Sequence, residues 1–219
     1  MEKNEQIAKV QITEQEIIDV LNERHSEEVQ AKLSNARVAV AGLGGLGSNI
    51  AVNLARIGIG HMLLVDFDEV ELTNLNRQQY FLRHVGKKKT EALAELLGWI
   101  NPYLDIKTVC VKVTEENISR LFSDYDYICE AFDRADQKAM LVNGVLSELP
   151  GRKLVAASGM AGYGNSNQIR TKRVMKNFYL CGDEVSESVP GSGLMAPRVA
   201  LCAAHQANLV TELILNEGE

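Results

Sequence analysis

A glycine cluster between an apolar run and a helical pattern constrains this sequence more than any other feature. Residues 37–41 (RVAVA) are apolar and partly β-branched, and Gly42-Leu43-Gly44-Gly45-Leu46-Gly47 follows at once. Helical spacing of apolar residues continues over 48–57. Glycines permit a tight turn, and the start of a helix presents backbone amides to phosphate oxygens. We therefore expect Gly42, Gly44, Gly45 and Gly47 to shape a nucleotide site.

Strand and helix patterns alternate along the rest of the chain. The expected strands are apolar without alternation, which is typical of a parallel sheet covered by helices on both faces. We predict a doubly wound, Rossmann-like α/β fold, mostly parallel, with an antiparallel extension at 167–171 and a closing helix. The further expected strands are 61–66, 106–113, 127–132 and 153–157, and the expected helices are 86–100, 115–122, 135–148 and 197–215.

The chain divides into an N-terminal helical segment, 1–35, and an α/β domain, 36–219. One helix is expected over 13–33, where Thr13 and Glu16 have the spacing of a capping box.

Charge and composition argue against several classes of function. The 219 residues carry a formal net charge of −6, so general attraction to nucleic acid or to an anionic membrane is not expected. No apolar run approaches the roughly 20 residues of a membrane span, and the polar start predicts a cytoplasmic protein. The cysteines (Cys110, Cys129, Cys181 and Cys202) form no C-x-x-C pair, so no zinc site is expected.

An acid at the end of the second expected strand, Asp66, has the offset of a ribose ligand, which alone favours NAD. The polar residues that follow fit a polyphosphate better, because strand ends line one crevice and cations there neutralise phosphate charge. Taken singly, each of these polar residues is explained equally well as an ordinary solvent-exposed residue. The set comprises Asn74, Arg77, a lysine among 87–89, and Asp133 after a later strand, which could hold magnesium. Asp68, two residues after Asp66, is a further cofactor-binding candidate.

This ordered set resembles the ThiF/MoeB/HesA superfamily of ubiquitin-activating-type enzymes. The matching motifs are G-x-G-G-x-G, D-x-D, N-x-x-R-Q, G-x-x-K-x-E and the later aspartate, and the resemblance spans about 36–217. Residues 74–81 and 195–198 look closest to the short ThiF-like subfamily of thiamin biosynthesis.

By position, the resemblance implies that Asp66 binds the ribose and that Asn74, Arg77, Gln78 and Lys89 surround the phosphates. Asp133 would hold magnesium. Arg77, Lys89 and Asp133 are thus the expected catalytic residues of a nucleotidyltransferase that requires ATP and Mg²⁺.

The implied reaction is adenylation of the C-terminal glycine carboxylate of a small ubiquitin-like sulfur carrier ending in Gly-Gly, by a homodimer. Two other functions stay open. One is a related ATP-dependent dehydratase or activating enzyme that acts on a different carboxylate or on tRNA. The other is an NAD-binding Rossmann module.

The sequence departs from the family in several places. The zinc-binding cysteine pairs are missing, and Cys181 is expected to be a buried or inert thiol. The loop 182–193 lacks the reactive cysteine of some relatives. Arg24 matches only the first arginine of the segment that often reaches across the dimer, and Arg134 replaces the usual asparagine after Asp133.

Overall fold

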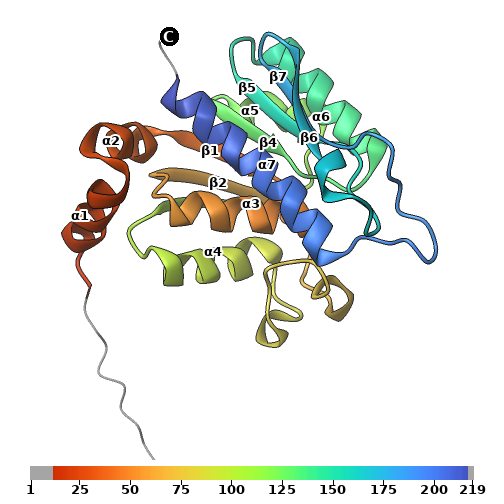
Figure 1. Ribbon diagram of the computed structural model, residues 1–219, viewed down its shortest axis with the longest axis horizontal. Coiled ribbons are helices and arrows are strands. Elements are labelled where there is room, and N and C mark those ends of the chain that lie inside the picture. Colours follow the sequence, from red (N-terminus) through yellow and green to blue (C-terminus); the bar gives the residue numbers. More distant parts are fainter. Residues whose placement is uncertain (1–11, 217–219) are drawn as a thin grey trace, which may run out of the picture.

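The computed structural model describes residues 12–216, which form a seven-stranded sheet with helices on both faces (Figure 1). The strand order is β3-β2-β1-β4-β5-β7-β6, and every neighbouring pair of these strands is parallel except β7 with β6. The doubly wound fold with an antiparallel extension is therefore confirmed. The strands are β1 (Arg37–Ala41), β2 (His61–Asp66), β3 (Asp105–Cys110), β4 (Tyr127–Glu130), β5 (Lys153–Ala157), β6 (Arg170–Met175) and β7 (Phe178–Gly182).

Alternate residues of β1 enter two separate cores. Val38 and Val40 pack on one face and Ala39 and Ala41 on the other, and all four are fully buried. Because both faces are covered, the strand has no polar side, which explains its continuous apolar sequence. Helices α3 (Gly45–Arg56), α4 (Lys89–Ile100) and α7 (Ala196–Leu215) cover one face, and α5 (Ile118–Phe122) and α6 (Ala135–Glu148) cover the other (Figure 1).

The N-terminal segment contains two helices where one was expected. Helix α1 (Glu14–His25) begins at the predicted capping box, since Thr13 and Glu16 exchange side chain–backbone hydrogen bonds. It ends at Ser26, whose φ of 81° lies outside the helical region. The Ser26 hydroxyl then accepts the N–H of Val29 and caps α2 (Glu27–Asn35). The prediction of one helix was wrong because a serine that caps the second helix interrupts the first.

The antiparallel extension is a hairpin of β6 and β7. We expected a single strand at 167–171, but a short 3-10 turn occupies Ser166–Gln168 and the strand begins at Arg170. Strand β7 also pairs in parallel with β5, so the hairpin continues the main sheet.

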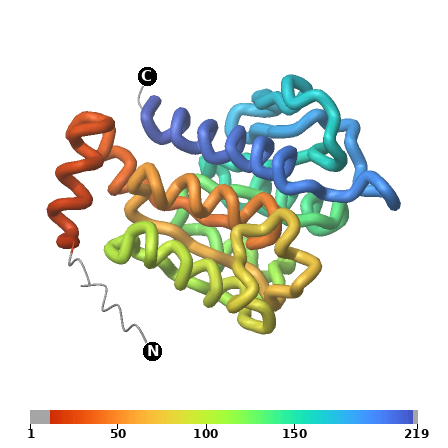
Figure 2. The backbone as a smooth tube through the Cα atoms, turned by 60° about the horizontal axis from the view of Figure 1, so that its bottom comes forward, coloured from red at the N-terminus to blue at the C-terminus, as the bar shows by residue number. Residues whose placement is uncertain are grey.

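The carboxyl ends of β1, β2 and β4 lie at one edge of the sheet. The segment between β2 and α4 covers this edge and contains two 3-10 turns, η1 (Leu72–Asn74) and η2 (Leu82–His84) (Figure 2). The first turn of α7 also reaches this edge, since Val199 packs against Gly45. Within residues 12–216, no helix has both the length and the apolar character needed to cross a bilayer.

Candidate functional site

The glycine turn joins β1 to α3 by a path that side chains would block. Gly42 has a φ of +90°, and a Cβ there would lie 2.8 Å from the carbonyl oxygen of Ala131. A Cβ on Gly47 would lie 1.8 Å from the carbonyl oxygen of Gly42. Helix α3 begins after Gly44 without a side-chain cap. Its first N–H groups therefore have no side-chain acceptor and suit an anion. That these glycines shape a nucleotide site stays a prediction.

Asp66 joins the segments that follow β1 and β2. One carboxylate oxygen accepts the N–H of Leu43 at 2.6 Å, and the other accepts the N–H of Asp68 at 2.8 Å. The residue is only 8% exposed. A carboxylate offers about four acceptor positions, so two remain for a ligand hydroxyl. Its role as a ribose ligand stays a prediction.

Arg77 and Gln78 lie over the glycine turn. A Cβ on Gly45 would be 3.3 Å from Cγ of Arg77, and a Cβ on Gly44 would be 3.6 Å from Nε2 of Gln78. Nε of Arg77 and Oε1 of Gln78 are both buried and have no hydrogen-bond partner within the described residues. Buried polar atoms normally have partners, so these two atoms beside an uncapped helix fit a polar ligand.

Lys89 and Asp68 bind each other. Their ion pair measures 2.9 Å, and the side chain of Lys89 is 8% exposed. The sequence predicted that both contact the nucleotide, but not that they pair. An ammonium group has three donors, so the contact with Asp68 leaves donors for phosphate oxygens.

Tyr80 is a residue of this site that the sequence interpretation missed. Its hydroxyl donates to the carbonyl oxygen of Leu43 at 2.8 Å and so joins the segment before α4 to the glycine turn. Burial raises the pKa of Tyr80 well above its usual value, and the negative charge of Asp66 adds to the shift. The hydroxyl therefore stays protonated and remains a donor.

Asn74 has a local hydrogen bond. Its side-chain oxygen accepts the N–H of Glu71 at 3.1 Å and closes the turn η1. Asn74 lies three residues before Arg77, and among residues 12–216 no hydrogen bond joins its side chain to the glycine turn. Its predicted contact with a phosphate stays a prediction.

Asp133 lies in the loop between β4 and α6, directly after the residues that pack on Gly42. It is exposed, and its side chain makes no hydrogen bond among the residues described. Residues 12–216 contain no group of three His, Cys, Asp or Glu side chains that could hold a metal. Mg²⁺ commonly binds through one or two carboxylates, waters and substrate phosphates, so a lone aspartate beside a phosphate site fits it.

Behind this loop is a buried ion pair that the sequence did not reveal. Glu130, the last residue of β4, is fully buried, and its two carboxylate oxygens lie 3.1 and 3.0 Å from Nζ of Lys138. Burial raises the pKa of the Glu130 carboxyl, while Lys138 and the N–H of Phe132 oppose the shift.

A second buried ion pair, between Asp183 and Arg198, links the loop 182–193 to α7. The guanidinium of Arg198 binds the carboxylate of Asp183 and, at 3.1 Å, the carbonyl oxygen of Asn165. Burial works to raise the pKa of Asp183, but hydrogen bonds from Ser186, Val185 and Arg198 outweigh it and lower that pKa to about 2. The start of this loop is therefore fixed close to the site.

The remaining candidates lie outside the site or are inert. Arg134 pairs with Asp136 on the surface. Arg24 lies in the last turn of α1, and α1 and α2 lie at the amino end of the sheet (Figures 1 and 2). Cys181 is buried, as expected, and burial rather than the neighbouring acids raises its pKa to about 11.

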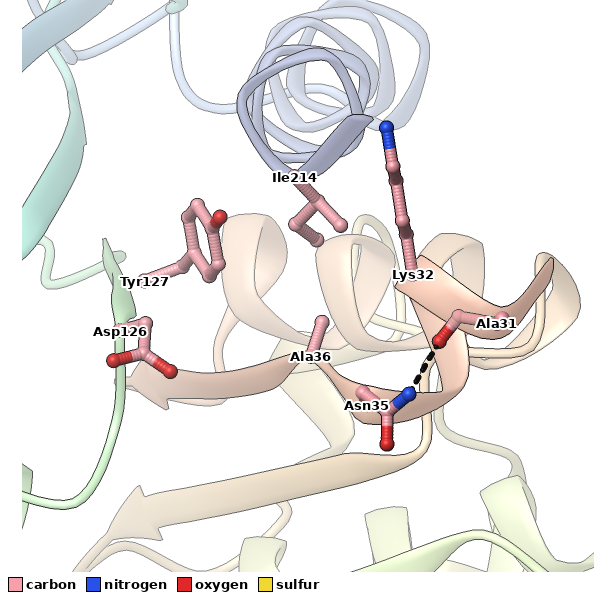
Figure 3. Close-up of a pocket in the computed structure, with 7 residues that line it drawn as sticks. All are labelled: Ala31, Lys32, Asn35, Ala36, Asp126, Tyr127 and Ile214. Atoms are coloured by element: carbon pink, nitrogen blue, oxygen red, sulfur yellow. Dashed lines mark hydrogen bonds between the residues drawn. The ribbon is translucent and has the colours of Figure 1, made fainter. Parts of the chain in front are cut away.

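A shallow hollow of about 360 Å³ lies at the opposite, amino end of the sheet (Figure 3). It is lined mainly by α2, α7 and the strand starts, and Lys32 bridges its rim to the carbonyl oxygen of Leu215 at 2.9 Å. None of the sequence-predicted site residues lines it.

Comparison with protein families gives a match to the ThiF family over residues 18–219. Among curated proteins, tRNA threonylcarbamoyladenosine dehydratase of Escherichia coli K12 is 36% identical over 157 residues, 70% of this chain and 58% of the relative. UBA4 of Vanderwaltozyma polyspora, an adenylyltransferase and sulfurtransferase, is 33% identical over 154 residues, 70% of this chain and 35% of that protein. The alignments therefore span less than two thirds of either relative.

Among solved structures, the E. coli dehydratase TcdA in complex with ATP superposes with a TM-score of 0.82 at 25% identity. The match covers 93% of this chain and 96% of that one. The predicted superfamily is confirmed by these findings. The expected closeness to the thiamin subfamily is not confirmed, since these relatives are named for tRNA modification or for adenylyl and sulfur transfer.

Proposed function

The chain belongs to the ThiF family of ATP-utilising activating enzymes, and from that premise we propose that it adenylates a carboxylate. One observation carries the proposal: a buried Arg77 nitrogen and a buried Gln78 oxygen without partners lie over the uncapped start of α3. The Arg77 donor and the N–H groups of α3 suit phosphate oxygens, and the Gln78 acceptor suits a hydroxyl or amino group of a nucleoside. The complex of TcdA with ATP supports a nucleoside triphosphate as the ligand here.

The proposed reaction needs charge neutralisation more than acid–base catalysis. A carboxylate oxygen forms a bond to the α-phosphorus of ATP, and the bond to the bridging oxygen breaks, so that pyrophosphate leaves with the electron pair. The nucleophile is already ionised, so no general base is required. Arg77, Lys89 and the N–H groups of α3 stabilise the charge on the phosphates. Asp133 would hold Mg²⁺, which supplies further neutralisation when bound.

We propose that the first acceptor to test is the carboxylate of threonylcarbamoyladenosine in tRNA. Support comes from the relatives named as dehydratases of this nucleoside, at 36% identity for the E. coli protein. Loss of water from a carboxyl-bearing nucleoside fits adenylation, because the carboxylate oxygen then leaves with AMP.

A second acceptor is a small sulfur carrier that ends in Gly-Gly. Two observations favour it: the 33% identity to UBA4, and a net charge of −6, which does not attract tRNA. The nucleotide chemistry is the same for both acceptors.

Pyrophosphate exchange tests the proposal. Purified protein with Mg-ATP is given either tRNA carrying threonylcarbamoyladenosine or a carrier ending in Gly-Gly, and the acyl-adenylate is sought by mass spectrometry. Exchange with one acceptor, and its loss in Arg77→Ala, is the expected result. Folded protein that exchanges with neither acceptor contradicts the proposal. Thermal stabilisation by NAD but not by Mg-ATP would instead support the NAD-binding alternative.

A further inference from the structure

A buried carboxylate, Glu130, lies directly behind the loop 131–134, and the proposed adenylation chemistry does not use it. Its side chain has no exposed surface. It accepts the N–H of Phe132 at 2.7 Å and binds Nζ of Lys138 through both oxygens. One carboxylate thus joins the loop to the first turns of α6.

The same loop packs against the glycine turn. The N–H of Ala131 donates to the carbonyl oxygen of Ala41 at 2.8 Å. Ala131 and Phe132 also approach Gly42 so closely that a Cβ there would lie within 3.0 Å of both residues. Asp133 is the next residue. The conformation that Glu130 imposes at Phe132 therefore sets where Asp133 lies relative to the start of α3.

Stability alone does not explain the choice of an ion pair here. A buried ion pair is often matched or exceeded in stability by apolar side chains of similar volume. An apolar pair, however, offers no acceptor for the N–H of Phe132, and a partly buried N–H left without a partner lowers stability. The ion pair supplies a fixed acceptor at this position, which an apolar core lacks.

We propose that Glu130, held by Lys138, is a positioning residue that orders the loop 131–134 and directs Asp133 towards the phosphates beside the glycine turn. This inference rests on the proposed use of Mg-ATP at the site. Glu130 acts through Phe132 and does not touch the nucleotide. Its loss is expected to weaken the contacts that depend on Asp133 and to spare the contacts with the nucleoside.

Two double variants separate the acceptor from the charge. Glu130→Leu with Lys138→Met removes both the ion pair and the acceptor for Phe132. Glu130→Gln with Lys138→Met removes both charges but keeps a carbonyl oxygen that can accept the same N–H. A control is Asp126→Leu with Arg152→Met, which removes a more exposed ion pair at the amino ends of β4 and β5.

Three quantities are measured on the full chain: the Kd for Mg-ATP, the Kd for AMP without metal, and hydrogen exchange of residues 131–138 without nucleotide. The leucine variant is expected to raise the Kd for Mg-ATP by about tenfold or more, to leave AMP binding nearly unchanged, and to speed exchange at Phe132. The glutamine variant should recover much of both effects. The control should bind and exchange like the wild type in this segment.

Wild-type binding of Mg-ATP together with unchanged Mg-ATP binding by the leucine variant would overturn this inference and leave the proposed function intact. Equal weakening of AMP and Mg-ATP would also overturn it, since that result indicates general loosening. If the leucine variant does not fold, hydrogen exchange in the wild type tests the inference. Slow exchange of the Phe132 amide supports its hydrogen bond to Glu130, and exchange at the rate of an unprotected loop refutes the inference. A wild type that binds no Mg-ATP contradicts the proposed function itself.

Discussion

Replacing Gly47 by alanine tests whether the glycine turn must close as tightly as it does. Gly47 lies in the first turn of α3, and an added Cβ would lie 1.8 Å from the carbonyl oxygen of Gly42 and 3.1 Å from Cγ1 of Val40. Real Cβ atoms essentially never approach another heavy atom closer than 3.0 Å. The nearest neighbour is backbone, so no side-chain rotation relieves the clash. The start of α3 must move away from the turn by roughly 1 Å.

The expected cost follows from two opposing effects. Overpacking of a closed contact costs about 1–3 kcal/mol, while alanine gains about 0.8–1 kcal/mol over glycine inside a helix. We expect a net loss of up to about 2 kcal/mol, with a fall in Tm of about 2–4 °C for each kcal/mol in a chain of this length. Affinity for ATP should fall further, because misplacement of binding groups by about 1 Å can cost roughly 100-fold.

Gly98→Ala is the matched control, since Gly98 also lies in a helix, α4, and a Cβ there would meet nothing within 4 Å. It should raise stability by about 0.8–1 kcal/mol and leave ATP binding unchanged. Thermal unfolding and calorimetric titration with ATP measure both effects. If Gly47→Ala gains stability as Gly98→Ala does and binds ATP like the wild type, the close approach of Gly42 to α3 is not what forms the site.

Three further predictions concern charge and burial. Arg77→Ala should lower kcat/KM for pyrophosphate exchange by an amount equivalent to about 2–4 kcal/mol with little change in Tm, and unchanged exchange would contradict its phosphate role. The Asp183 carboxyl, with a pKa of about 2 when folded against an ordinary 3.8, contributes about 2 kcal/mol above pH 4 that is lost as the pH falls from about 4 to 2. The free energy of unfolding of Asp183→Asn should therefore fall less steeply as the pH decreases over that interval. A fall as steep as in the wild type would argue against the ion pair between Asp183 and Arg198. Of the four cysteines only Cys110 is exposed, so a thiol reagent should modify one cysteine in the native protein and all four after denaturation.

The main features of the fold were predictable because the pattern of apolar residues in each segment agrees with the topology of the sheet. The β1 sequence is apolar on both faces, and a parallel sheet covered by helices requires that property. The break at Ser26 was not predicted, because the apolar pattern runs through it and only its backbone conformation divides the helix. The hairpin of β6 and β7 was misplaced for a related reason. Strand β6 is exposed along its whole length and carries no apolar alternation that would mark its limits.

Within the site, sequence patterns located the residues that lie directly at the end of a predicted strand or at the start of a predicted helix. The glycine turn and Asp66 follow directly from the ends of β1 and β2, and the structure joins them through the N–H of Leu43. Contacts between distant segments were not predictable in the same way. Glu130 and Lys138 lie on different elements, and neither residue type nor spacing shows that Glu130 points inward at the end of β4. Arg198 and Asp183 share this property, since their pairing depends on where the loop 182–193 meets α7.

The lysines at 87–89 show why burial decides between equivalent-looking charges. Each lysine pairs with a different acid: Lys87 with Glu95, Lys88 with Glu69, and Lys89 with Asp68. The side chains of the first two are 44% and 42% exposed, so their pairs contribute little and their charges are screened by water. Lys89 is 8% exposed and follows a segment that Tyr80 joins to the glycine turn. A phosphate placed there meets an ammonium group in a poorly solvated position, where charge neutralisation is stronger than at the surface. The triplet therefore contains one poorly solvated cation, Lys89, the same lysine that the family motif indicates; its contact with a nucleotide stays a prediction.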